Sequence, residues 1–303
     1  MRVLLTGASG LLGRAIAYRL SARGDIELTQ AAFSRIKPPA VKVDLTDDAS
    51  MASLFDLARP DFVIHAAAER RPDLVDGKPT EAAALNVQAT ENIARACAEK
   101  RAFLLYISTD YVFDGRNPPY SPDSPVNPLN EYGRQKLEGE RRIMAILPEG
   151  RYAILRLPIL YGRVERLGES AVTELAAHLA TAKTAAGAPR SIEHWAKRYP
   201  LHVDDAAAAI ENILDASPAL LNPIYQLSGR ETLTKYEMVL VMAEALGLDH
   251  SLIFPDPSPP KGAPRPQDCR MDTGLLEDMG YRQSVGFRQG IAEALAPFFQ
   301  AGG

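Results

Sequence analysis

The chain is poor in cysteine and histidine, and this scarcity excludes two common ways of stabilising or activating a protein. Its 303 residues include only two cysteines, Cys97 and Cys269, which form no Cys-x-x-Cys pair. Two cysteines are too few for a disulfide framework, so we expect a reduced protein of the cytoplasm. The five histidines show no His-x-x-x-His spacing. We therefore expect no metal site built on histidine and cysteine ligands.

Long apolar runs and a surplus of positive charge are also absent from the sequence. No apolar segment approaches the ~20 residues of a membrane-spanning helix. The opening MRVLLTGASG is typical of a strand that enters a turn, so we expect no signal peptide there. The net charge of −4 argues against a protein that binds nucleic acid by neutralising phosphates. We expect neither a membrane nor a nucleic acid as a partner.

The first 162 residues alternate short apolar segments with amphipathic ones. The segments that we expect to be strands are rich in Val, Ile, Leu and aromatic residues, and they cover 2–7, 25–33, 40–45, 61–68, 103–109 and 152–162. The expected helices cover 11–23, 47–59, 80–100 and 131–146. This alternation predicts an α/β fold, a Rossmann-type doubly wound parallel sheet with helices on both faces.

The regular alternation of expected strands and helices ends at Gly162. We expect helices at 169–185, 204–216 and 234–247, a strand at 223–229, and irregular chain at 187–200 and in the Pro-rich segment 256–268. Thr234 and Glu237 have the spacing of a capping box. We assign 1–162 to a dinucleotide-binding domain and 163–303 to a smaller α/β substrate lobe packed on it, and parts of each half can exchange between the lobes.

The first expected strand leads into TGASGLLGR, a turn that contains Gly7, Gly10 and Gly13. It follows a strand and opens a helix, the context that a dinucleotide-binding glycine motif requires. The first glycine permits a tight turn, and the second lets backbone N–H groups approach a pyrophosphate. The third allows the helix to pack closely on the strand. The alternative is a glycine-rich turn that binds no ligand.

The end of the second expected strand bears on the choice of dinucleotide. An acidic residue there, about 20 residues past the glycines, would hold the ribose 2′-OH of NAD. Ser34 and Arg35 fill the place instead, and Lys37 follows. Arg35 suits a 2′-phosphate and Arg14 can assist it, so NADP(H) is favoured over NAD(H) as cofactor. The alternative for Arg35 is a solvated charge in a loop.

The glycine spacing resembles the T-G-x-x-G-x-x-G motif of the extended short-chain dehydrogenase/reductase superfamily. Asp44 and Leu45 resemble a pair that contacts adenine in that superfamily, and Asn86 matches an Asn that braces the active site, with a buried structural Asn as the alternative. The resemblance implies a set of cofactor-binding residues, namely Gly7, Ser9, Gly10, Leu11, Leu12, Gly13, Ser34, Arg35, Asp44, Leu45, Ala66, Ala67, Ala68, Tyr132, Lys136 and Pro158.

Tyr132 and Lys136 are four positions apart in an expected helix, so they share one of its faces. Thr109 ends the fifth expected strand, where side chains of a parallel sheet meet ligands. This combination resembles the superfamily's catalytic triad, with Tyr132 as the proton donor and Thr109 as a hydrogen-bond donor to the developing oxyanion. Lys136 should lower the pKa of the tyrosine and bind the nicotinamide ribose. The alternative is a solvated surface turn.

Three segments narrow the resemblance. Residues 108–115 (STDYVFDG), 128–136 (PLNEYGRQK) and 265–272 (RPQDCRMD) resemble dTDP-4-dehydrorhamnose reductases, which reduce the 4-keto group of a nucleotide-linked sugar with NAD(P)H. Residues 69–73 (ERRPD) depart from that family's pattern. They resemble instead the regulatory β subunits of methionine adenosyltransferase, relatives of the reductases that keep NADP binding. This second resemblance extends over nearly the whole chain and is the closer of the two.

Two hypotheses follow from these resemblances. The first is an NADPH-dependent reductase of a nucleotide-linked 4-keto sugar, in which Arg70, Arg71 and Arg265 grip a diphosphate. The alternative for these arginines is surface ion pairing. The second hypothesis is a non-catalytic subunit that binds NADP and attaches to methionine adenosyltransferase. The C-terminal Phe298 and Phe299 would then serve as an anchor, or else simply pack the last helix down. Some relatives are dimers, so a homodimer is a further expectation.

Overall fold

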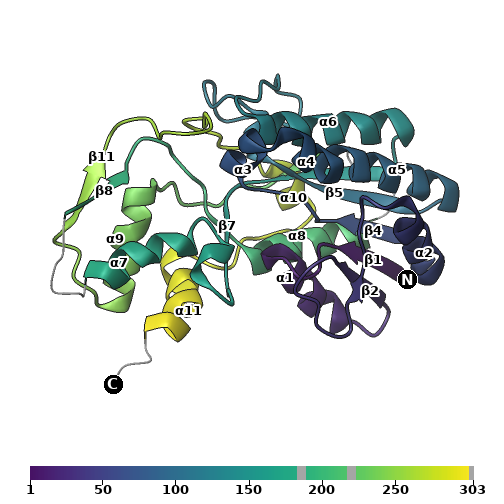
Figure 1. Cartoon of the computed structure of the whole chain (residues 1–303), viewed down its shortest axis with the longest axis horizontal. Helices are drawn as coiled ribbons and strands as arrows, with labels where there is room; N and C mark the ends of the chain where they lie inside the picture. Colours follow the sequence, from purple (N-terminus) through teal and green to yellow (C-terminus); the bar gives the residue numbers. More distant parts are fainter. Residues whose placement is uncertain (183–188, 217–222, 300–303) are drawn as a thin grey trace.

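The computed structural model describes residues 1–182, 189–216 and 223–299. A sheet of seven strands lies at its centre, in the order β10-β6-β5-β4-β1-β2-β3 (Figure 1). Every neighbouring pair is parallel. The strands are β1 (Arg2–Thr6), β2 (Glu27–Ala32), β3 (Val41–Lys42), β4 (Phe62–His65), β5 (Phe103–Thr109), β6 (Tyr152–Leu157) and β10 (Ile224–Gln226). The predicted Rossmann-type fold class is confirmed.

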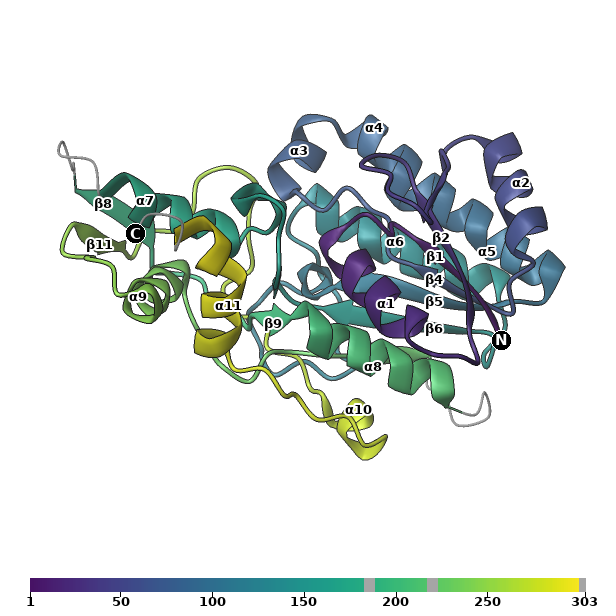
Figure 2. The same cartoon turned by 90° about the horizontal axis from the view of Figure 1, so that it is seen from below.

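Helices cover both faces of this sheet, as Figure 2 shows. One face carries α2 (Asp48–Ala58), α5 (Ala89–Lys100) and α6 (Glu131–Ile146), and the other carries α1 (Leu11–Ser21), α8 (Val203–Asp215) and α10 (Gly274–Asp278). Successive strand residues point to opposite faces, so Leu4 packs into the first layer and Leu5 into the second. Covered on both sides, the strands are continuous apolar runs and not alternating ones.

A second lobe with its own hydrophobic core lies beside the sheet (Figure 1). It contains α7 (Ala177–Ala182), α9 (Lys235–Leu246), α11 (Phe287–Phe299) and a pair of parallel strands, β8 (Arg190–Glu193) and β11 (Ile253–Asp256). The short strands β7 (Leu160–Tyr161) and β9 (Leu201–His202) pair with each other. After entering this lobe the chain returns to the sheet, because α8 and β10 both follow residue 162 and both lie in the Rossmann layers.

Proline and side-chain hydrogen bonds account for two departures from the expected elements. The strand expected at 152–162 divides into β6 and β7 at Pro158, which has no N–H to donate. The helix expected at 169–185 begins as 3-10 turns at Leu167–Glu169 and Thr173–Ala176 before α7. Ser170 breaks it, because its hydroxyl accepts from the Val172 N–H and donates to the Leu160 carbonyl. Residues 183–185 lie outside the described ranges.

Other boundaries also differ from the sequence-based expectation. The strand expected at 40–45 consists of β3 alone, and the helix expected at 80–100 is interrupted by a π-helical turn at Ala84–Gln88 between α4 (Pro79–Ala83) and α5. The short helix α3 (Pro72–Gly77) and the strands β8 and β11 were not predicted. The capping box of Thr234 and Glu237 at the start of α9 is confirmed.

Candidate functional site

The glycine turn between β1 and α1 lies against the residues that follow β4. Gly7 has a φ of +73°, and a Cβ added to it would lie 2.7 Å from the Ala67 nitrogen. A Cβ on Gly13 would lie 2.1 Å from the Gly7 carbonyl oxygen. Both positions therefore require glycine, because a side chain would collide with the backbone at each. Gly7 also has a left-handed backbone conformation that favours glycine. Gly10 is the N-cap of α1, whose first turn has no acidic residue to neutralise the positive end of the helix dipole.

The three predicted catalytic side chains come from two elements at the same edge of the sheet. Thr109 is the last residue of β5 and is buried, while Tyr132 and Lys136 lie one turn apart near the start of α6. Asn130 caps that helix by accepting a hydrogen bond of 2.8 Å from the Gly133 N–H. Hydrogen bonding to the Thr109 hydroxyl acts on the pKa of the Tyr132 phenol, so these two side chains lie together. Lys136 follows one turn later on α6.

Burial raises the pKa of the Tyr132 phenol above its ordinary value, while hydrogen bonding to Thr109 and the charge of Arg70 act in the opposite direction. The phenol is therefore protonated at neutral pH, as a proton donor must be. This balance differs from the sequence-based expectation, in which Lys136 lowers the tyrosine pKa. The guanidinium that favours the phenolate in this structure is the one of Arg70.

Lys136 is 3% exposed, and its ammonium lies 3.9 Å from the centroid of the Tyr106 ring. This is a cation–π contact on the face of an aromatic ring. Burial lowers the pKa of Lys136 to about 7, although the nearby Glu140 acts to raise it. Burial and the Lys136 charge together lower the pKa of His65 to about 3, so that imidazole is neutral. It bridges the hydroxyls of Thr6 and Thr90 at 2.7 and 3.1 Å.

A buried ion pair lies one helical turn beyond Lys136. Glu140 is 0% exposed and receives two hydrogen bonds from Arg156 of β6, at 2.7 and 3.1 Å. The Ser108 hydroxyl of β5 also donates to Glu140. These bonds join α6 to β5 and β6, so they position Lys136 and Tyr132 against the end of β5.

The predicted cofactor residues surround the carboxyl edge of β1, β2 and β4. Arg35, in the turn after β2, has a left-handed φ of 52°, and its guanidinium pairs with the buried carboxylate of Glu169. Asp44 accepts hydrogen bonds from the N–H and hydroxyl of Thr46, at 2.9 and 2.6 Å. The remaining predicted residues lie in the glycine turn and the start of α1, in the turn after β2, or in the segments that follow β3, β4 and β6, and they are Ser9, Leu11, Leu12, Ser34, Leu45, Ala66, Ala68 and Pro158.

The three arginines predicted to bind substrate differ in their surroundings. Arg71 pairs with Glu69 at 2.6 Å, and its side chain is 60% exposed. Arg265 pairs with Asp73 at 2.5 Å. For these two the structure shows the ion pairing that was the alternative interpretation. Arg70 instead donates to the Glu169 carbonyl and lies close enough to Tyr132 for each to affect the other's pKa.

Asn86 is buried and hydrogen-bonded, as both interpretations of this residue require. It is 1% exposed, accepts from the Glu69 N–H at 2.9 Å and donates to the Glu69 carbonyl at 3.1 Å. A further hydrogen bond of 3.1 Å reaches Gln135 on α6. Asn86 thereby ties the segment that carries Arg70 to the helix that carries Tyr132.

Comparison with known proteins identifies the family. Residues 1–299 match the model of the RmlD substrate binding domain. The chain belongs to this family. It is 43% identical over 300 residues to methionine adenosyltransferase 2 subunit beta of Xenopus tropicalis, covering 98% of this chain and 88% of the relative. It is 28% identical to the dTDP-4-dehydrorhamnose reductase of Mycolicibacterium smegmatis, covering 97% and 85% of the two chains.

A solved structure of the family supports the fold. The dTDP-4-dehydrorhamnose reductase of Bacillus anthracis, determined in complex with NADP, matches this RmlD-family chain with a TM-score of 0.81 at 23% identity. The match covers 98% of each chain. The resemblances stated from the sequence, to the reductases and to the β subunits, are both confirmed as resemblances.

Sequence reasoning missed two buried charged residues near the predicted catalytic residues of this RmlD-family protein. Asp110 directly follows Thr109, and burial raises the pKa of its carboxyl to about 6, although the charge of Arg198 acts to lower it. Arg198 is 4% exposed and donates to the Pro266 carbonyl at 3.1 Å. Asp110 could have been identified as a candidate site residue from its position next to Thr109. No local pattern marks Arg198, which lies in a segment without regular structure.

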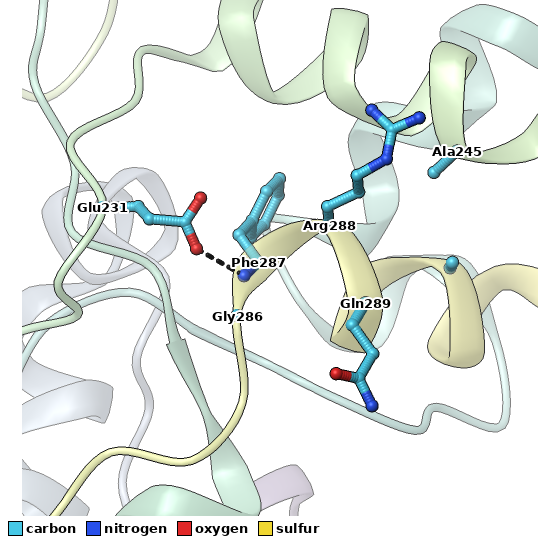
Figure 3. Close-up of a pocket in the computed structure, with 7 residues that line it drawn as sticks. Glu231, Ala245, Gly286, Phe287, Arg288 and Gln289 are labelled. Atoms are coloured by element: carbon cyan, nitrogen blue, oxygen red, sulfur yellow. Dashed lines mark hydrogen bonds between the residues drawn. The ribbon is translucent and has the colours of Figure 1, made fainter.

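A hollow in the surface lies elsewhere, in the second lobe (Figure 3). It encloses about 470 Å³ between the start of α11 and the end of α9, near Ala245. Its charged side chains already have partners, since Glu231 accepts from the Phe287 N–H at 2.6 Å and Arg288 pairs with Glu244 at 2.8 Å. Its lining contains no residue of the glycine turn and none of the three predicted catalytic residues. The sheet edge, where those residues lie, remains the candidate functional site.

Three further observations concern features considered in the sequence analysis. Among residues 1–182, 189–216 and 223–299, no group of three or more His, Cys, Asp or Glu side chains is placed to hold a metal ion. The helices of these same ranges include none with the length and apolarity of a membrane span. Near the C-terminus, Phe299 packs against the core of the second lobe, which is the alternative to an exposed anchor.

Proposed function

We propose that this chain is an NADPH-dependent reductase that acts on the 4-keto group of a nucleotide-linked sugar. The observation that supports the proposal is the position of Thr109 at the carboxyl end of β5, with Tyr132 and Lys136 one turn apart near the start of α6, at the sheet edge that also carries the glycine turn. Ligands of open parallel sheets bind at this edge. A cofactor-bearing relative of the same fold supports the choice of a nicotinamide dinucleotide.

The residues at this edge suit such a cofactor. The close backbone approach at Gly7 and Gly13 forms the tight turn that a pyrophosphate needs, and α1 begins there with its dipole unneutralised. Arg14 and Arg35 supply positive charge on the side where a 2′-phosphate would lie, which favours NADP(H) over NAD(H). Bound NADPH would supply a hydride to the carbonyl carbon of the substrate.

The chain's own residues handle the oxygen of that carbonyl. As the carbon gains the hydride, the oxygen gains negative charge and takes a proton from the Tyr132 hydroxyl, so the product is an alcohol. Thr109 donates a hydrogen bond that stabilises the charge while it develops. The tyrosinate left behind lies near the Arg70 guanidinium, whose charge favours it until solvent returns the proton.

The test follows the absorbance of NADPH in the presence of a dTDP-4-keto-6-deoxy sugar. Wild-type protein should oxidise NADPH, and Tyr132→Phe should lower kcat by at least about 100-fold, the usual contribution of a positioned general acid. Tyr18→Phe is the matched control, because Tyr18 is 85% exposed on α1 and should turn over like wild type. Loss of activity in the control alone, or equal activity in wild type and Tyr132→Phe, would contradict the assignment.

A second candidate is a cofactor-binding subunit of methionine adenosyltransferase. It is favoured by the 43% identity to a β subunit over nearly the whole chain, and by Arg71 and Arg265, which already pair with Glu69 and Asp73. The discriminating experiment mixes purified chain with the methionine adenosyltransferase of its own source and separates the mixture by size-exclusion chromatography. A stable complex, together with no sugar-dependent NADPH oxidation, would favour this second function. Separate elution of the two proteins at their unmixed positions, together with turnover, would favour the reductase, which we place in the cytoplasm.

A further inference from the structure

The segment 163–169, here called the strap, crosses from the second lobe to the dinucleotide-binding edge. It follows β7 and ends at Glu169, whose side chain is only 4% exposed. The Glu169 carboxylate pairs with Arg14 of α1 at 2.8 Å and with Arg35 in the turn after β2. It also accepts from the Glu165 N–H at 3.0 Å, which holds the strap in a compact turn.

Basic residues from three separate places hold the strap against the Rossmann half. Arg14 reaches the Arg163 carbonyl at 3.4 Å as well as the Glu169 carboxylate. Lys37, which lies in the same turn as Arg35, pairs with Glu165. Arg70, beyond β4, donates to the Glu169 carbonyl. The strap therefore spans the carboxyl ends of β1, β2 and β4, the crevice in which a dinucleotide binds.

The Glu169 contacts lie where the proposed function needs a phosphate. The guanidinium of Arg35 sits in the turn after β2, the place that faces the 2′ position of a bound adenosine ribose. Its left-handed φ of 52° is uncommon for a residue with a side chain, and such conformations occur where the surrounding structure demands them. A carboxylate on this arginine satisfies the same donors that a phosphate would use.

We infer that Glu169 sets the dinucleotide preference by competing with the 2′-phosphate for Arg14 and Arg35. The inference rests on the proposed cofactor site. A 2′-phosphate carries up to two negative charges, so it must displace the Glu169 carboxylate or bind beside it against like-charge repulsion. A ribose 2′-OH can donate to the same carboxylate. Glu169 therefore weakens NADPH binding and supports NADH binding.

The test measures the dissociation constants of NADPH and NADH by isothermal titration, with no substrate present. Glu169→Gln should bind NADPH about tenfold more tightly than wild type, because both arginines become free for the phosphate. Its affinity for NADH should be unchanged or lower. Glu165→Gln is the matched control on the same strap, since it removes a partner of Lys37 and leaves the Arg14 and Arg35 pairs intact. It should leave the NADPH/NADH ratio within about twofold of wild type.

The combined variant Arg35→Gln/Glu169→Gln tests whether Arg35 is the residue for which Glu169 and the 2′-phosphate compete. The gain in NADPH affinity from Glu169→Gln should vanish when Arg35 is already replaced.

Hydrogen exchange in wild-type protein gives a second readout that needs no variant to fold. NADPH should loosen the amides of residues 163–169, and NADH should not.

The possible failures are distinguishable. If Glu169→Gln leaves the NADPH/NADH ratio unchanged, or NADPH protects the strap amides, this inference is wrong while the cofactor assignment stands. If wild-type protein binds neither dinucleotide, the cofactor assignment falls and this inference falls with it.

Discussion

Replacing Glu140 by Gln tests the structural support of the site most directly. The carboxylate is fully buried, and its partner Arg156 is 3% exposed on the side chain. Glu140→Gln keeps the shape of the side chain but leaves the Arg156 charge without a counter-ion. Removing one member of a buried ion pair costs about 3–5 kcal/mol, because the remaining charge stays out of water. We expect the free energy of unfolding to fall by that amount.

The same change should also affect the catalytic lysine. Glu140 is the group that acts to raise the pKa of Lys136. Without the carboxylate charge, burial acts on Lys136 unopposed, so its pKa should fall further below 7. A smaller fraction of Lys136 is then charged at neutral pH. The proposed reductase activity should therefore fall in Glu140→Gln even at temperatures where the variant is folded.

Urea unfolding followed by circular dichroism and by fluorescence of the single tryptophan, Trp195, measures the effect. The control is Glu138→Gln on the same helix, whose side chain is 35% exposed and pairs with Arg142 at 2.7 Å. Exposed helical pairs contribute roughly 0.3–0.5 kcal/mol. The reasoning is refuted if Glu140→Gln costs no more than Glu138→Gln, since the pair would then be solvated.

Two predictions remain beyond those made with the proposals. Lys136 has a pKa near 7 in the fold against 10.5 ordinarily, so between these values the unfolded chain holds more protons and folding becomes more favourable as pH rises. The unfolding free energy of wild type relative to Lys136→Met should thus increase by about 2 kcal/mol from pH 7 to pH 9. A difference in unfolding free energy between the two proteins that is the same at both pH values would contradict a buried lysine. Gly13→Ala would place a Cβ 2.1 Å from the Gly7 carbonyl and should weaken NADPH binding at least about tenfold, with a cost of ~1–3 kcal/mol in stability. Gly24→Ala, with no atom within 4 Å of the added Cβ, should bind NADPH like wild type; a similar loss in both variants would mean that the close approach at Gly13 is unimportant.

The predictions that succeeded concerned short-range patterns. The alternation of apolar strands and amphipathic helices predicted the parallel sheet, because each strand needs both faces covered. The spacing of Gly7 and Gly13 predicted a tight strand-to-helix turn, and the structure shows at both positions that a Cβ would collide with backbone. The i, i+4 spacing of Tyr132 and Lys136 needs only a helix to place both on one face. Each of these inferences depends on residues that are close in sequence.

Contacts between distant residues decided the rest. Glu169 meets Arg14 and Arg35 across 155 and 134 positions, and no local pattern marks that pairing. The pKa directions also depend on the fold, since burial is the largest influence on Tyr132 and Lys136 and is a property of the packed molecule. The sequence by itself determined which side chains could do the chemistry. Only the tertiary structure decided which charges surround them, because electrostatic environment comes from elements that the chain brings together after folding.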